Sequence, residues 1–258
     1  MYSVVIPTYG NKGVNLTRDC LESMKILQHE HEVIVVDDGS SEGDLEELTR
    51  ICDIHGVALY HNEQNQGFAK TCNVGMMKSN GAVVILLNND VRMLGPSLDL
   101  LADAMQISNA GVMGIRLLYP NYTIQHAGQF FVPNGNYFDH YCRHEPRYAP
   151  QAIVFKSRLV SGACYAIHRR VIEAIGFFDE NFAMAVEDVD YSLSCLELGA
   201  PVIYNGHIEA LHLEGATRGN TPETKSPDHT MREQLGLQYL FEKWQGLDLK
   251  RFTREAQG

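Results

Sequence analysis

Short runs of consecutive apolar residues alternate with amphipathic stretches early in the chain, and this alternation constrains the fold more than any other feature. The apolar runs lie at residues 3–6, 33–36, 57–60 and 83–87. Apolar residues recur at helical spacing between these runs, at residues 16–27, 45–54 and 68–78. Strands that are apolar on both faces are typical of parallel sheets covered by helices on each side. We therefore expect a doubly wound, Rossmann-like α/β fold with a mostly parallel central sheet.

The middle of the chain is less regular. Residues 111–160 are rich in Gly, Pro, Tyr and His, which predicts short strands and long loops of the kind that recognise ligands. Regular patterns return as strands at 164–167 and 202–204 and as helices at 169–175, 189–198 and 231–245. Residues 215–228 are polar and predict a loop ahead of the C-terminal helix.

Composition excludes several classes of function. The net charge of −11 argues against a nucleic-acid or anionic-lipid surface over the chain as a whole. The six cysteines form no CxxC pair, which favours reduced structural thiols in a cytosolic protein. The N-terminus lacks the basic region of a signal peptide, and the longest apolar stretch is too short to cross a bilayer. We expect a cytoplasmic protein without a transmembrane segment, and leave open a peripheral position at the inner membrane face.

Polar clusters follow three of the predicted strands, at residues 7–9, 37–40 and 88–90. Ligands of doubly wound sheets bind at the carboxyl ends of the strands. One such cluster alone is more often a strand-ending turn, but three together, two of them acidic, indicate a binding site. A carboxylate such as Asp90 can bind a hard cation, and that cation can bridge two phosphate oxygens.

Three carboxylates lie close together at Glu187, Asp188 and Asp190, ahead of a predicted helix. They can simply stabilise the positive end of that helix. Crowded carboxylates also raise one another's pKa, which can turn one of them into a general base. His212 lies among apolar residues and is either a core histidine or a metal ligand. Gly67 precedes a helix without GxGxxG or Walker spacing, so a dinucleotide or P-loop site has little support.

In their order along the chain, these motifs resemble those of the family 2 glycosyltransferases of the GT-A fold. The matching residues are 4–9, 32–40, 65–69, 73, 75, 86–90, 124–128, 161–164, 176–180, 187–190, 212 and 214–216. The match covers roughly the first five-sixths of the chain at sensible spacing. Residues 124–128 and the later acidic pair look like the branch that contains rhamnosyltransferase-like and O-antigen-type enzymes.

The resemblance implies an inverting, metal-dependent glycosyltransferase of the hexosyltransferase type. Such an enzyme moves a sugar from a nucleotide-diphosphate donor, here UDP or dTDP, to a hydroxyl of a glycan, lipid-linked or protein acceptor in polysaccharide biosynthesis. It implies Mn²⁺ or Mg²⁺ as cofactor. We expect a GT-A catalytic domain over residues 1–220, with a nucleotide-binding half (1–108) and an acceptor half (109–220). Residues 221–258 are expected to form a C-terminal loop and helical extension.

The resemblance also assigns roles to single residues. Those assigned to the nucleotide are Pro7, Thr8, Asp38, Asn65, Gly67, Lys70 and Asn73. Asn88, Asn89 and Asp90 occupy the family's DxD position, where Asp90 contacts the metal and His212 completes its coordination.

Further along the chain, Asp188 takes the role of catalytic base, with Glu187 beside it. Ser161 and Gly162 are expected near the donor sugar. Asn88 stands where many members have Asp, so metal binding is expected to be weaker or to depend more on His212.

Two other functions are compatible with the same residues. A sugar nucleotidyltransferase also uses an α/β nucleotide fold and a cation. Residues 9–13 resemble the Gly-rich basic loop of that class only weakly. A non-catalytic nucleotide-sugar-binding module is the other alternative. Asn88 favours that module, whereas Asp90, Asp188 and His212 argue against it.

Overall fold

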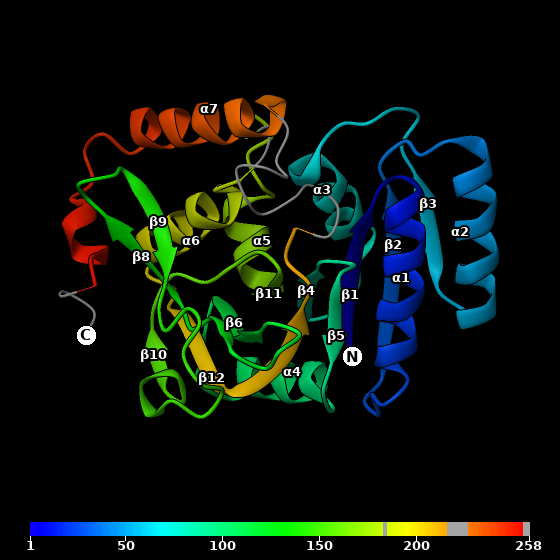
Figure 1. Ribbon diagram of the computed structural model, residues 1–258, viewed down its shortest axis with the longest axis horizontal. Helices are drawn as coiled ribbons and strands as arrows, with labels where there is room; N and C mark the ends of the chain where they lie inside the picture. The colour runs from blue at the N-terminus through cyan, green and yellow to red at the C-terminus, as the bar shows by residue number, and fades with distance from the viewer. Residues whose placement is uncertain (183–184, 216–226, 255–258) are drawn as a thin grey trace.

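The apolar runs of the N-terminal part form neighbouring strands of one large sheet (Figure 1). The coordinates are a computed structural model and describe residues 1–182, 185–215 and 227–254. The strands of the sheet are β1 (Tyr2–Thr8), β2 (His31–Asp37), β3 (Ala58–His61), β4 (Val83–Leu87), β5 (Val91–Met93), β6 (Val112–Leu118), β7 (Ile124–His126), β10 (Phe155–Ser157), β11 (Cys164–His168) and β12 (Val202–His212). β8 (Gln129–Val132) and β9 (Tyr137–His140) form a separate hairpin.

The main path of the sheet runs β10-β12-β6-β11-β4-β1-β2-β3. β3, β2, β1 and β4 are parallel neighbours, and β12 is parallel to β6. β11 alone in this central part runs the other way, antiparallel to both β4 and β6. The prediction of a mostly parallel sheet is confirmed. The carboxyl ends of β1, β2, β4 and β12 lie along one edge, and the beginning of β11 reaches that same edge.

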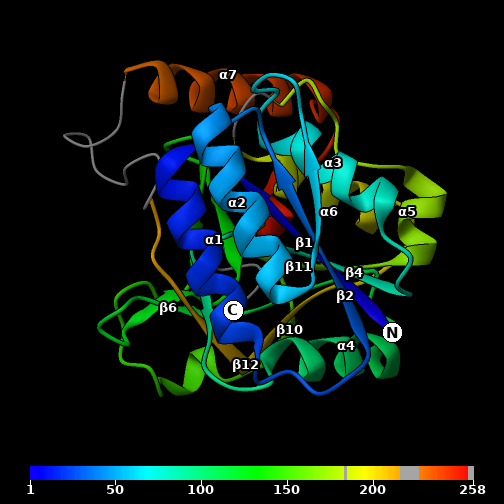
Figure 2. The same ribbon diagram turned by 90° about the vertical axis from the view of Figure 1, so that its right-hand side faces the viewer.

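Helices cover both faces of the sheet, as Figures 1 and 2 show. The helices are α1 (Gly10–Met24), α2 (Glu42–His55), α3 (Phe68–Lys78), α4 (Ser97–Ser108), α5 (Arg169–Ile175), α6 (Glu187–Glu197) and α7 (Pro227–Lys243), with short 3-10 turns η1 (Pro150–Ala152) and η2 (Leu249–Phe252). Side chains of α1, α2 and α4 pack on one face with Val4 and Ile85. Those of α3, α5 and α6 pack on the other with Val5 and Val84. Successive strand residues thus enter opposite cores, which explains why these strands are apolar throughout.

Three predicted elements match the structure residue for residue: α3, β4 and α5. β1 was expected to stop at Pro7 but continues to Thr8. Thr8 O accepts a hydrogen bond from Asp38 N on the β2 side, so Pro7 faces β4. Pairing with β4 ends at Val5, and the missing N–H of Pro7 therefore removes no ladder bond.

The expectation of short strands and long loops in residues 111–160 was wrong at β6, which is seven residues long. All seven residues of β6 are buried inside the sheet. Gly114 and Arg116 interrupt its apolar pattern, because Gly114 packs against Val160 and the buried Arg116 pairs with Glu209 of β12. β12 is also longer than predicted, because its register shifts between Asn205 and Glu209 and so tolerates a polar interruption.

The C-terminal helix α7 lies against α6 and the turn before it (Figure 1). Leu240 and Trp244 enter a third apolar cluster with Val189 and Leu193 of α6 and Phe252 of η2. The start of α7 is Pro227, four residues before the predicted start, and the polar loop expected at residues 215–228 lies mostly outside the described residues. None of the described helices is long and apolar enough to cross a bilayer.

One glycine of α3 sets how closely that helix approaches the sheet. A methyl group at Gly75 would lie 2.1 Å from Val5 Cγ1 of β1. We expect Gly75→Ala to lower the free energy of unfolding by about 1–3 kcal/mol, because this overpacks a buried contact. Gly43→Ala in exposed α2 is the matched control, since nothing lies within 4 Å of its added methyl. It should raise stability by about 0.5–1 kcal/mol. Urea unfolding measures both, and equal effects would refute the close-approach argument.

Candidate functional site

Thr8 connects the ends of three strands at the carboxyl edge of the sheet. Its backbone carbonyl accepts from Asp38 N, which follows β2, at 2.9 Å. Its hydroxyl accepts from the side-chain amide of Asn89, which follows β4, at 3.0 Å. The Asn89 amide also reaches Gly13 O and Thr17 Oγ1 of α1, at 3.2 and 3.4 Å. Asn89 therefore points inward and fixes the turn after β4 against β1 and α1.

Asp38 is buried and binds the loop that leads into α3. Its Oδ1 accepts from Gln66 N at 2.8 Å and from the Asn62 amide at 3.1 Å. Its Oδ2 accepts from Gly67 N at 2.9 Å. The carboxylate thus occupies the position of an anion at the positive end of α3. Since each oxygen has two acceptor positions, Oδ2 keeps capacity for one further donor.

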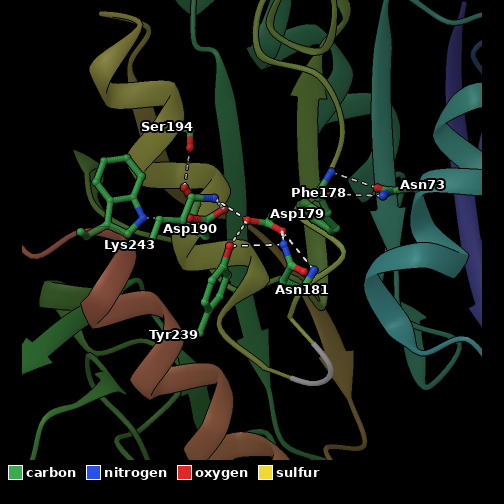
Figure 3. Close-up of polar contacts among 9 residues, drawn as sticks. Asn73, Phe178, Asp179, Asn181, Asp190, Ser194, Tyr239 and Lys243 are labelled. Carbon is green, nitrogen blue, oxygen red and sulfur yellow. Dashed lines mark hydrogen bonds and ion pairs between the residues drawn. The ribbon is translucent and has the colours of Figure 1, made fainter.

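The other residues assigned to the nucleotide lie around the start of α3. Asn65 is exposed on the loop before Gly67, and Lys70 is half-buried in the first turn. Asn73, which was expected to line the nucleotide pocket, is buried in α3 and contacts the backbone at Phe178. Its amide nitrogen donates to Phe178 O, and its amide oxygen accepts from Phe178 N, both at 2.9 Å (Figure 3). The Asn73 amide is engaged by backbone groups, and its geometry favours a structural role over lining a pocket.

Asn88, at the first DxD position, is oriented by its backbone. Its N–H donates to Ala163 O, just before β11, at 2.9 Å. Within the described part of the chain, its side-chain oxygen is buried and accepts no hydrogen bond. A buried amide oxygen in this state is costly unless a ligand supplies a donor or a cation.

Asp90 and His212 face each other across the edge of the sheet. His212 ends β12, and its Nε2 lies 3.1 Å from Asp90 Oδ1. Gln125 of β7 sets the orientation of the ring, because Gln125 Oε1 lies 2.7 Å from His212 Nδ1 and its amide nitrogen donates to His212 O at 3.4 Å. This arrangement places the ring proton on Nδ1 and directs Nε2 toward Asp90.

Residues 161–163, which we call the bridging segment, connect these residues to Asp188. Gly162 N donates to Asp188 Oδ2 at 2.7 Å, while Ala163 O accepts from Asn88 N. A side chain at Gly162 would approach Asp188 Cβ to 3.3 Å, so the backbone is in close contact with that carboxylate. The DxD position and the candidate base therefore lie on the two sides of one short backbone segment.

Asp188 lies in the first turn of α6 with both carboxylate oxygens oriented by backbone groups. Oδ1 accepts from Val189 N at 2.8 Å, beside the bond from Gly162 to Oδ2. Glu187 is buried next to it. Burial raises the pKa of the Cys72 thiol well above its ordinary value, and the carboxylates of Glu187 and Asp38 raise it further. Cys72 of α3 is thus close enough to feel the charges of Asp38, in the nucleotide-binding half, and of Glu187, in the acceptor half.

Three residues to which the sequence assigned no role support this arrangement. Gln125 orients His212, and Tyr165 OH donates to Asp188 O at 3.2 Å. His126 lies under the bridging segment, where its Nε2 accepts from Ser161 N at 3.3 Å. Burial, and then His140 beside it, lower the pKa of His126 well below its ordinary value, so the ring is neutral at neutral pH. The motif at residues 124–128 contains two of these residues, but only the fold shows what they contact.

The fold and the ordered motifs agree with a comparison against known families. The model of glycosyl transferase family 2 matches residues 3–176. The chain belongs to this family. The O-antigen biosynthesis protein RfbC of Myxococcus xanthus is 31% identical over 147 residues, which make 55% of this chain and 12% of that protein. Protein y4gI of Sinorhizobium fredii is 27% identical over 268 residues, 96% of this chain and 28% of that protein. The chain thus spans less than a third of either relative.

Solved structures show the same fold. GalNAc-T7, whose crystal structure contains UDP, GalNAc and Mn²⁺, superposes with a TM-score of 0.74 at 16% identity, over 97% of this chain and 49% of that one. The fold of the family 2 chain is GT-A, as the sequence predicts. The family match ends at residue 176, ahead of Glu187, Asp188 and His212. The roles of these three residues therefore depend on the geometry described above.

Two asparagines assigned to one pocket should behave differently. Asn73→Ala removes the partners of Phe178 N and O, and we expect it to lower the free energy of unfolding by about 1–3 kcal/mol. Asn65→Ala is an exposed change and should stay within about 0.5 kcal/mol of the parent protein. Chemical denaturation of both variants tests this, and an unchanged stability for Asn73→Ala would contradict the structural role.

Proposed function

We propose that this family 2 protein is an inverting, metal-dependent glycosyltransferase that moves a sugar from a nucleotide-diphosphate donor to an acceptor hydroxyl. The observation that carries the proposal is the bridging segment, which holds Asn88 on one side and Asp188 on the other. A group that binds the donor diphosphate and a group that takes a proton must lie this close together for direct transfer. Membership of the family supports the same reaction class.

The pair of Asp90 and His212 fits a divalent cation. In the tautomer with the proton on Nδ1, His212 presents the Nε2 lone pair 3.1 Å from Asp90 Oδ1, and an imidazole nitrogen and a carboxylate oxygen are both ligands that Mn²⁺ accepts. Two ligands at right angles, each about 2.1 Å from an octahedral cation, lie about 3.0 Å apart. Among the described residues, no cluster of three or more His, Cys, Asp or Glu side chains could hold a metal. Water and the donor diphosphate would supply the remaining ligands, as is common for Mg²⁺.

The residues of the chain would divide the reaction between them. When bound, Mn²⁺ or Mg²⁺ neutralises charge on the departing diphosphate. Asp188 accepts the proton of the acceptor hydroxyl as that oxygen attacks the anomeric carbon, with its carboxylate oriented by the N–H groups of Gly162 and Val189. Attack in line with the leaving group, with no enzyme nucleophile, inverts the anomeric centre.

Structural and sequence neighbours support a class of donor. We propose a UDP- or dTDP-sugar, since the GT-A relative GalNAc-T7 binds UDP and RfbC is named for O-antigen biosynthesis. We propose that Pro7, Thr8, Asp38, Asn65 and Gly67 surround the base and ribose of the donor, with Lys70 on the phosphate side. We propose a glycan, lipid-linked or protein acceptor and a catalytic unit over residues 1–220. The buried, free cysteines support the cytoplasm as its location.

Asp188→Asn tests the base directly. The amide keeps the size of the carboxylate but cannot take a proton at neutral pH, so we expect transfer to fall by about 10²–10⁴-fold. Donor binding, measured by calorimetry, should change little. Glu187→Gln is the neighbouring control and should retain more activity than Asp188→Asn. Near-normal transfer by a folded Asp188→Asn protein would exclude Asp188 as base.

Removal of the metal tests the Asp90 and His212 pair. We expect EDTA to abolish transfer and Mn²⁺ or Mg²⁺ to restore it. Gln125→Met removes the group that orients His212 at similar volume, and should weaken Mn²⁺ binding by about 10–100-fold. Titration calorimetry measures this affinity. Full activity in EDTA would exclude a required metal, while unchanged Mn²⁺ affinity in Gln125→Met would exclude the orienting role.

A further inference from the structure

The end of α7 holds an acidic residue in the first turn of α6. Asp190 is buried, and its Oδ1 accepts from the indole N–H of Trp244 at 2.8 Å. Its Oδ2 accepts from Lys243 Nζ at 3.0 Å. Figure 3 shows Lys243 reaching Asp190 from α7, next to Tyr239, which contacts Asp179. α7 lies beyond the residues matched by the family model, so these contacts are additional to the family motifs.

The backbone just before α6 is strained. Ala185 and Val186 have φ of +69° and +60°, in the left-handed region that a β-branched residue such as Val rarely adopts. α6 also begins without a side-chain cap. Non-glycine backbone in this region persists only where surrounding contacts hold it. The first turn of α6 therefore needs support from outside the helix.

Two sets of contacts supply this support from opposite sides. On the sheet side, Gly162 N and Tyr165 OH bind Asp188. On the outer side, Trp244 and Lys243 bind Asp190, two residues further along the same turn. Asp190 N also donates to Val186 O at 3.0 Å, which connects the outer contact to the strained residue. Any shift of Asp190 would therefore move the turn that carries Asp188.

We propose that Lys243 and Trp244 are positioning residues, through which α7 holds the candidate base Asp188 in its reactive place against Gly162. The inference rests on the proposed function, because it assigns these residues to the position of that base. It makes α7 a part of the active-site support and not only a cover for the third apolar cluster. A displacement of about 1 Å in a reacting group can lower a rate by about 10²-fold.

Trp244→Phe tests the proposal because it keeps a buried aromatic ring and removes the N–H donor, together with the second ring of the indole. We expect kcat to fall by about 10–100-fold with the KM for the donor sugar nucleotide nearly unchanged. Tyr239→Phe is the matched control on the same helix, since it removes a hydrogen bond to Asp179 and none to α6. It should lower the melting temperature by less than Trp244→Phe, because Tyr239 is only partly buried, and leave kcat within about twofold of the parent.

A second pair of variants covers the case in which one change unfolds the protein. Lys243→Met leaves Asp190 buried without its cation and also removes the contact of Lys243 with Asp179, which should be strongly destabilising. Adding Asp190→Asn removes the more buried of the two charges and should restore part of the stability, while the loss of the Lys243 contact keeps kcat low. Recovery of full kcat together with stability in this double variant, or equal kcat losses in Trp244→Phe and Tyr239→Phe, would overturn the positioning role.

A readout without substrate separates this inference from the proposed function. The Gly162 amide donates to Asp188, so its hydrogen exchange reports the position of that carboxylate. In glycine-labelled protein, Trp244→Phe should accelerate exchange at Gly162 and leave Gly114 of β6 unchanged. Unchanged exchange at Gly162 would overturn the positioning role. Faster exchange in a protein that transfers no sugar from any donor would support the contact while refuting the proposed function.

Discussion

The hydrogen bond from Gly162 N to Asp188 Oδ2 is the contact on which the rest of the site depends. It joins α6, on one face of the sheet, to the backbone that enters β11 in the middle of the sheet. The adjacent carbonyl of Ala163 binds Asn88, so the same short segment also sets the position of the turn after β4. A bond from a backbone N–H to a charged oxygen is strong and directional, and it suits a position that must hold two groups at a set distance.

Several polar residues of the family motifs form hydrogen bonds that hold the loops and helices of the protein together. Asp38 binds the loop before α3, Asn73 binds the backbone at Phe178, and Asn89 binds Thr8 and α1. At the edge of a parallel sheet, the N–H and C=O groups of the loops have no partners in the strand ladder. These side chains supply the missing hydrogen-bond partners. Side-chain hydrogen bonds therefore hold the loops of the carboxyl edge in place within the protein itself. Such an edge lowers the entropic cost of binding the nucleotide-diphosphate donor that we propose.

The sequence predicts the fold well where one local pattern dominates. α3, β4 and α5 show unbroken periodicity and match the structure, whereas β6 was missed because Arg116 breaks an otherwise apolar run. The charge is tolerated there only because Glu209 pairs with it from another strand. A local pattern carries no information about such a distant partner.

The same limit applies to the site. The order of the motifs identifies Asp90, Asp188 and His212 as candidate site residues, and the fold shows which groups they contact. The order of the motifs could not show that Asn73 binds a backbone segment 105 residues away, or that Gln125 orients His212 across 87 residues. The support given to Asp190 by α7 is equally invisible, since Trp244 reads in the sequence as one more apolar residue of an amphipathic helix.

The reversed direction of β11 has a consequence for how this chain can vary. In a uniformly parallel sheet, every strand delivers its following loop to the ligand edge, and that loop can change length without disturbing the strand. β11 instead delivers the residues that precede it, while its own end at His168 leads into α5 at the far edge. Insertions after His168 would leave the site intact, whereas a single extra residue before Cys164 would shift the bridging segment out of register with both of its partners. In this family 2 chain, the length of the bridging segment is therefore constrained by its contacts with Asn88 and Asp188.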